Sequence, residues 1–240
     1  MLTIEKTVLP SPEQWEIIIE GMRNPMNSWD KSDSFKTHIE DPETQATADF
    51  EHFLGDNDLD LMRRLAAGGS VHAKYRRMIP VFVTINAPLY WWKEFDTYKV
   101  GTVCNSCSTM HKIHAKEFTL DDFSCEHLSR MSLSVIIKNT VPTLNHYRKL
   151  YNEADEELKR KDLTEEKRKH VTAQRKHYWW QMIQLLPTSY NQKRTVMLNY
   201  EVLVNIYRWR RDHKLTEWHT FCDWIEQLPY SELITGKEVS

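Results

Sequence analysis

Residues 185–228, LLPTSYNQKRTVMLNYEVLVNIYRWRRDHKLTEWHTFCDWIEQL, decide the fold of this chain. The pattern predicts a loop punctuated by Pro187, then one helix, a short polar break and a second helix. In the first helix, one face carries residues at helical spacing: Asn199, Leu203, Ile206 and Arg210. In the second, an apolar stripe consists of Leu215, Trp218, Phe221, Ile225 and Leu228. The stretch therefore predicts a buried helix pair with a polar cluster at the end of the first helix.

The composition favours one soluble domain covering residues 1–240. A chain of 240 residues buries a substantial core, and no Pro-, Gly- or Ser-rich linker divides it. With 32 Lys and Arg against 34 Asp and Glu, the near-zero net charge argues against polymeric nucleic acid or an acidic membrane as main partner. We find no signal peptide and no apolar run long enough to span a bilayer. Four cysteines in such a chain favour reduced thiols and a cytoplasmic location.

The N-terminal half is predicted to mix strands and helices. Residues 1–9 fit an edge strand, and Ser11 followed by Pro12 fits a helix start. The other expected elements are a polar loop at 24–43, helices at 47–54 and 59–67, a strand at 78–86 and a helix that starts at Pro88.

The C-terminal half is predicted to be mainly helical. A helix at 126–139 is expected to bury Leu128, Met131 and most of residues 133–137. Residues 143–176 fit a helix pair, whose charged run at 156–169 is interpreted as a solvated surface. After Pro229 the chain is expected to fray.

Four positions in residues 185–228 carry a resemblance to a known family. Pro187, Asn199, Asn205 and Arg210 follow one another at intervals of 12, 6 and 5 positions. The C-terminal part of the flavin-dependent thymidylate synthases is similar, with Leu-Pro, two asparagines and an arginine at the same offsets. The resemblance implies that Asn199 and Asn205 lie at the flavin and that Arg210 reaches a uracil nucleotide.

A second region resembles the same family. A strand ending in Ala87-Pro88 precedes a helix, as it does before the family signature R-H-R-x-x-S-x-N-E-x-S-x-R. Counted without a gap, the R-H-R positions fall on Thr97, Tyr98 and Lys99. Lysine keeps the charge of arginine but lacks its bidentate fork. The resemblance therefore implies that Lys99 contacts a phosphate or pyrophosphate as a point charge.

One inserted residue aligns the second half of the signature. The N-E-x-S positions then fall on Asn105, Ser106, Cys107 and Ser108, and the nucleotide arginine falls on Met110. The resemblance implies that Asn105, Ser106 and Ser108 line the nucleotide phosphate. His111 is a further candidate phosphate donor, with an ordinary surface or core histidine as the competing interpretation.

The resemblance also implies a fold and a reaction. The family has an α+β fold with a small antiparallel sheet and several long helices, and it forms homotetramers with sites between subunits. It uses FAD, NADPH and methylenetetrahydrofolate to methylate dUMP at C5, giving dTMP. Arg210 is the candidate catalytic residue, because its charge would stabilise or orient the uracil ring.

Three functional alternatives stay open. The first is a flavin-dependent thymidylate synthase with a drifted signature. The second is a relative that modifies another uracil nucleotide on the same scaffold, in a bacterium or phage. The third is a non-catalytic nucleotide-binding or assembly protein.

A zinc site is the main competing interpretation of the segment after Lys99. Cys104 and Cys107 form a C-x-x-C pair, followed by His111 and His114. The gap of three residues between Cys107 and His111 is much shorter than a zinc finger needs, so no metal site is predicted. The cysteines are instead expected to be small buried side chains.

Overall fold

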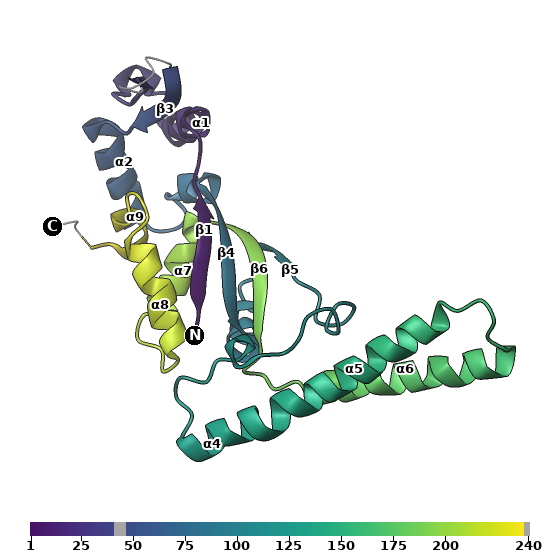
Figure 1. Ribbon diagram of the computed structural model, residues 1–240. Helices are drawn as coiled ribbons and strands as arrows, with labels where there is room; N and C mark the ends of the chain where they lie inside the picture. Colours follow the sequence, from purple (N-terminus) through teal and green to yellow (C-terminus); the bar gives the residue numbers. More distant parts are fainter. Residues whose placement is uncertain (41–46, 238–240) are drawn as a thin grey trace. The chain divides into compact units, whose positions relative to one another are not determined.

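The computed structural model describes residues 1–40 and 47–237 and has the expected α+β fold with small antiparallel sheets (Figure 1). The four-stranded sheet has the order β1-β4-β6-β5, formed by Thr3–Val8, Pro80–Pro88, Asn191–Asn199 and Val103–Ser106. A separate antiparallel pair consists of β2 (Phe35–Glu40) and β3 (Thr47–Phe53). The chain divides into two units. Unit 1 contains Met1–Thr3, Asn86–Phe95 and Ser106–Arg194, and unit 2 contains the remainder.

The first helix of unit 2, α1 (Pro12–Arg23), begins where the sequence predicts it. The Ser11 side chain accepts a hydrogen bond from the Gln14 backbone N–H, and the Gln14 side chain accepts one from the Ser11 backbone N–H. This capping box satisfies two donors that a helix start leaves unpaired. The predicted strand before it is confirmed as β1. Short helical turns η1 (Asn24–Met26) and η2 (Trp29–Lys31) then lead to the β2–β3 pair.

The middle of unit 2 contains α2 (Asp56–Ala67), the 3-10 helix η3 (Lys74–Met78) and strand β4 up to Ile85. The predicted helix at 59–67 is confirmed, with a start three residues earlier. In β4, Val81, Val83 and Ile85 are buried while Phe82 is exposed. This alternation confirms a strand here, which runs over Pro80–Pro88 and not over the predicted 78–86.

The C-terminal part of unit 2 is organised around α7 (Tyr200–Arg210). This helix packs against η3, α8 (Thr216–Glu226) and α9 (Glu232–Thr235) (Figure 1). Leu203 and Ile206 of α7 are fully buried, as are three residues of the predicted α8 stripe: Trp218, Phe221 and Ile225. The helix pair predicted within residues 185–228 is confirmed.

Unit 1 is mainly helical. It contains α3 (Leu89–Phe95), the 3-10 turn η4 (Leu120–Asp122), α4 (Arg130–Val135), the π-helical turn η5 (Ile136–Thr140), α5 (Val141–Leu158) and α6 (Glu165–Leu185). Helices α5 and α6 pack against each other as the predicted pair (Figure 1). The unit has its own apolar core, formed by Ile113, Phe118, Phe123, Leu144 and Met182. No helix in the described part of the chain is long and apolar enough to cross a membrane.

Two predictions for the N-terminal half are wrong. The helix expected at 47–54 is strand β3, and the loop expected at 24–43 contains β2; residues 41–43 lie outside the described residues. Phe35 is the strand partner of Phe53, and their rings stack with centroids 5.1 Å apart. Such cross-strand aromatic pairs stabilise a sheet through contacts distant in sequence, so local periodicity missed this pairing.

The loop predicted before α7 is also wrong, because this segment contains strand β6. Gln192, Val196 and Leu198 are buried at period-two spacing, while Lys193 and Thr195 are exposed. Because the buried Gln192 is polar, the alternation of apolar and polar residues typical of a strand is not visible in the sequence here. Asn199 is therefore the N-cap of α7, and the helix begins at the next residue.

The predicted burial at 126–139 is wrong for several side chains. Met131 is 80 % exposed, and Leu128, Val135 and Ile137 are also exposed. The helix does not end at 139, because α4 continues through η5 into α5. Pro142 has no backbone N–H, and the Val141 N–H bonds to the Ile136 carbonyl five residues back, so the chain forms a π-helical turn here.

The expected fraying after Pro229 is wrong as well. Helix α9 follows, and its Leu233 is fully buried. Tyr200 stabilises this segment, because the hydroxyl of this buried residue donates a hydrogen bond to the Pro229 carbonyl at 2.6 Å.

Candidate functional site

The largest cavity described here lies within unit 2 and has a volume of about 1160 Å³. Its wall is built by η3, the segment around Gly101, α7 and the residues that end α9. Helix α7 presents one face to it, with Glu201, Asn205 and Arg208 at helical spacing, and Asp212 lies just beyond the end of the helix. Sites for small molecules are commonly about 300–1,000 Å³. The cavity is therefore large enough for a nucleotide-sized ligand.

Asn199 and Asn205, the two asparagines of the predicted site, both line this cavity. Asn199 also caps α7, because its Oδ1 accepts the Val202 backbone N–H at 3.1 Å. Its Nδ2 faces Gly101, where a β-carbon would lie 3.1 Å away. Gly101 has φ +77°, a conformation that favours glycine. Glycine therefore allows the segment after Lys99 to approach the start of α7 closely.

Arg210 does not line the cavity. Its Nε donates to the Tyr98 hydroxyl at 2.9 Å, and its guanidinium carbon lies 4.8 Å from the centre of the buried Trp218 ring. The Tyr98 ring is 5.6 Å away. Cation–π contact and the hydrogen bond together hold the guanidinium between two aromatic side chains. Tyr98 is the residue that the count from Ala87-Pro88 predicts at the histidine position of the family signature.

The other predicted site residues lie in exposed segments. Lys99 and Asn105 belong to unit 2 and are exposed. Ser106, Ser108 and His111 belong to unit 1 and are exposed too, and the Ser108 Oγ accepts the His111 backbone N–H at 2.9 Å. This bond closes a turn. The nucleotide roles of these five residues stay predictions.

The C-x-x-C segment differs from its prediction. Cys107 is exposed and Cys104 is half-buried, so the expected burial of Cys107 is wrong. Among the residues that the structure describes, no group of three or more His, Cys, Asp or Glu side chains is arranged to hold a metal ion.

Burial raises the pKa of the Cys222 thiol to about 12, so this thiol stays protonated and packs as a core side chain.

Charge in the cavity is predominantly positive. Its lining contains five cationic side chains, Arg76, Arg77, Arg208, Arg211 and Lys237, against two acidic ones, Glu201 and Asp212. Arg211 pairs with Asp223, and Lys237 pairs with Glu226 at 2.9 Å. Arg76 faces Glu201 at 3.7 Å. Arg76 and Arg77 were not predicted as site residues, although they belong to a basic run at 74–77 before β4.

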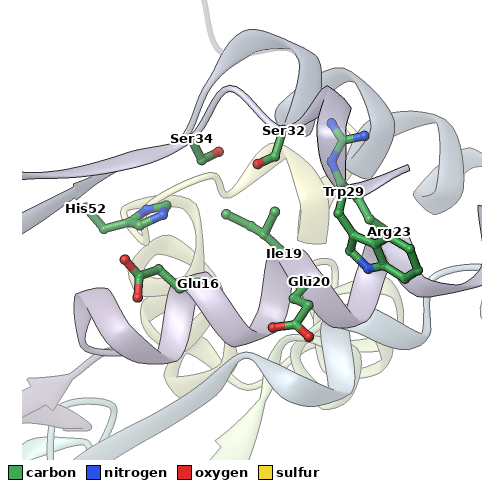
Figure 2. Close-up of a pocket in the computed structure, with 8 residues that line it drawn as sticks. All are labelled: Glu16, Ile19, Glu20, Arg23, Trp29, Ser32, Ser34 and His52. Atoms are coloured by element: carbon green, nitrogen blue, oxygen red, sulfur yellow. The ribbon is translucent and has the colours of Figure 1, made fainter. Parts of the chain in front are cut away.

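A second cavity, of about 430 Å³, lies between α1, the following turns and β3 (Figure 2). Figure 2 shows Glu16 and Glu20 on α1, with His52, Ser32, Ser34 and Arg23 around the opening. Arg23 donates to Asp58, whose other oxygen accepts from the hydroxyls of Ser32 and Ser34 at 2.7 Å each. Arg23, Ser32 and Ser34 of this cavity thus belong to one internal network around Asp58. Burial lowers the pKa of His52, which favours its neutral form.

Comparison with known proteins gives a match at the level of fold. No family model and no curated protein matches the sequence. A solved structure of Thymidylate Synthase X (ThyX) from Helicobacter pylori with FAD and dUMP matches with a TM-score of 0.55 and 14 % identity, covering 98 % of this chain and 95 % of that one. A second structure of the flavin-dependent thymidylate synthase ThyX from Helicobacter pylori, complexed with FAD and dUMP, matches with a TM-score of 0.53, 14 % identity and coverage of 98 % and 96 %. In fold, this chain is therefore similar to the flavin-dependent thymidylate synthase ThyX along nearly its whole length.

Proposed function

We propose that this chain binds FAD and dUMP and acts as a flavin-dependent thymidylate synthase-like enzyme. The reaction is the reductive methylation of dUMP to dTMP with methylenetetrahydrofolate and NADPH. One observation carries the proposal: Asn199 and Asn205, which match the family spacing, line the same cavity of about 1160 Å³ in a chain with a ThyX-like fold.

The cavity residues fit a flavin nucleotide. Its excess of cations suits phosphate groups, because guanidinium groups form charge-assisted hydrogen bonds to phosphate oxygens. The Asn205 amide, exposed on the cavity face of α7, carries both a donor and an acceptor for a ring edge or a ribose. When bound, FAD supplies hydride transfer, and the protein supplies binding and orientation.

Arg210 is proposed to orient the uracil nucleotide. Tyr98 and Trp218 restrict its side chain, which reduces the entropy lost when a ligand binds. Lys99 is proposed as a phosphate contact of the cofactor. The remaining proposed nucleotide contacts are Asn105, Ser106, Ser108 and His111.

A homotetramer is part of this proposal. Met131, Val135 and Ile137 expose apolar surface along one helical segment of unit 1. Apolar surface of this kind is typical of an interface between subunits. Light scattering coupled to size-exclusion chromatography tests the assembly, and a mass of one chain would contradict it.

The activity is tested by following NADPH oxidation in the presence of dUMP and methylenetetrahydrofolate and by identifying the product by mass spectrometry. Formation of dTMP supports the proposal. Asn205→Ala is expected to lower turnover, whereas the control Asn57→Ala, at an exposed position of α2, is expected to leave it unchanged. Equal turnover in the two variants would remove Asn205 from the site.

A second candidate function is the modification of another uracil nucleotide on the same scaffold. The contact between Tyr98 and Arg210 favours it, because the R-H-R positions carry Thr97, Tyr98 and Lys99 and the tyrosine engages the arginine directly. NADPH oxidation that depends on a uracil nucleotide and yields a product other than dTMP would support this candidate over the first.

A further inference from the structure

Arg76 is a buried cation in the wall of the large cavity. It lies on η3, and its side chain is only 9 % exposed. Its nearest acidic partner is Glu201, on the first turn of α7. A buried charge is costly unless it is both paired and hydrogen-bonded. The contacts of Arg76 therefore show whether its charge is compensated within the protein.

The pairing between Arg76 and Glu201 is incomplete. Their closest nitrogen and oxygen atoms are 3.7 Å apart, which exceeds hydrogen-bond distance. Arg76 Nε and Glu201 Oε2 are both buried without a hydrogen-bond partner. Natural proteins leave few such groups unsatisfied, and those that occur call for an ordered water, an ion or a functional role as explanation.

The surroundings of Arg76 favour an anion. Arg77, the next residue of η3, also lines the cavity, is exposed, and has no acidic partner among the residues that the structure describes. The acidic side chains of the lining are Glu201, already beside Arg76, and Asp212, just beyond the C-terminal end of α7. Arg211 and Lys237 are paired with Asp223 and Glu226, which lie outside the lining, so the positive balance of the lining comes from Arg77 and Arg208.

We propose that Arg76 and Arg77 form the phosphate subsite of this cavity. The two arginines supply there the positive charge that the signature segment lacks at Thr97 and Tyr98. Guanidinium groups bind phosphate bidentately, and a phosphate oxygen that accepts from Arg76 provides the hydrogen bonding that Glu201 does not. The inference rests on the proposed nucleotide site and identifies the residues that hold its anionic part.

Calorimetric titration of the full chain with inorganic pyrophosphate tests the subsite. Wild-type protein is expected to bind, and Arg77→Gln is expected to weaken binding roughly tenfold, as the loss of a charge-assisted hydrogen bond predicts. The control Arg64→Gln makes the same charge change on the exposed surface of α2, outside the cavity, and is expected to keep wild-type affinity. Equal affinities of all three proteins, or no binding by the wild type, would overturn the subsite.

A second variant distinguishes a loss of pyrophosphate binding from a loss of folding. Arg76→Lys keeps the charge opposite Glu201 but removes the guanidinium fork, and its folding is checked by urea denaturation. We expect a folded protein with weakened pyrophosphate binding. Arg77→Gln, at an exposed position, keeps the test valid if Arg76→Lys does not fold.

Titrations with FAD and dUMP distinguish the two proposals. If pyrophosphate binds in an Arg77-dependent way while neither nucleotide binds, the subsite stands and the proposed function fails. If FAD and dUMP bind with equal affinity to wild type, Arg77→Gln and Arg76→Lys, the subsite fails and the proposed function stands.

Discussion

The Arg210 guanidinium donates to the Tyr98 hydroxyl at 2.9 Å, between residues 112 positions apart in the chain. This bond joins the end of α7 to the segment that follows α3. In the same unit, Gly101 approaches Asn199 at the start of α7. The two segments that resemble the flavin-dependent thymidylate synthases are therefore in contact at both ends of α7.

Tyr98→Phe tests the role of this contact. The change removes the hydroxyl that accepts from Arg210 and keeps the ring, and we expect a loss of about 1 kcal/mol of unfolding free energy for a half-buried bond. If Tyr98 positions Arg210 for the nucleotide, dUMP affinity falls as well. Urea denaturation and calorimetry measure the two effects. Tyr178→Phe, at a half-buried position of α6, is the control, and equal behaviour of the two variants would show that the bond contributes nothing.

Gly101→Ala tests the close approach to Asn199. The backbone at φ +77° disfavours alanine, and the new β-carbon would lie 3.1 Å from Asn199 Nδ2 and 3.2 Å from Val202 Cγ2. We expect a destabilisation of about 2 kcal/mol. Gly69→Ala is the matched control, because Gly69 has φ +89° but no atom within 4 Å of the added carbon. Its expected cost is about 1 kcal/mol, from the backbone alone. Denaturation midpoints that coincide would contradict the steric account.

Asp58 gives the fold a predictable response to acid. Burial by itself raises the pKa of Asp58, but hydrogen bonds from Ser34 and Ser32 and the Arg23 guanidinium outweigh it, so the pKa lies below its usual 3.8. The stabilisation is therefore present above pH 3.8 and is lost as the pH falls through the lower folded-state pKa. We expect the unfolding free energy of the wild type to decline there.

Asp58→Asn removes this response. Breaking a buried ion pair costs about 3–5 kcal/mol, and we expect the variant to lose this much unfolding free energy at neutral pH. We also expect its unfolding free energy to change less than that of the wild type as the pH falls. Asp60→Asn is the control on the same helix, since its pair with Arg64 is exposed and contributes under about 1 kcal/mol. Parallel acid profiles for Asp58→Asn and the wild type would count against the assignment.

Leu233→Ala tests whether the chain after Pro229 belongs to the core. Leu233 is fully buried in α9, and truncating such a side chain costs about 2–5 kcal/mol. Val71→Ala, at a position that is 71 % exposed, is expected to change stability by less than about 0.5 kcal/mol. Thermal unfolding of both variants provides the comparison. A Leu233→Ala protein as stable as the control would mean that α9 does not contribute to the fold.

The sequence predicted the elements whose stability is decided locally. Ser11 with Gln14, and the apolar stripe from Trp218 to Ile225, specify helices through neighbours within a few positions. Strands β2, β3 and β6 were missed, because their pairing depends on residues distant in sequence. The Phe35–Phe53 contact and the buried Gln192 are examples.

The candidate site was predicted in part for the same reason. Asn199 and Asn205 were found by their spacing, and both line the cavity. Arg76 and Arg77 carry no motif, and only the packing of η3 against α7 brings them to the cavity wall. The hydrogen bond from Arg210 to Tyr98 joins residues 112 positions apart, so the spacing of residues along one helix could not predict it.

The absorption spectrum of the purified full chain tests the central claim most directly. A flavin nucleotide bound in the cavity beside Asn199 and Asn205 predicts a yellow protein that releases FAD when it is denatured. A colourless protein that also fails to bind added FAD would contradict the account.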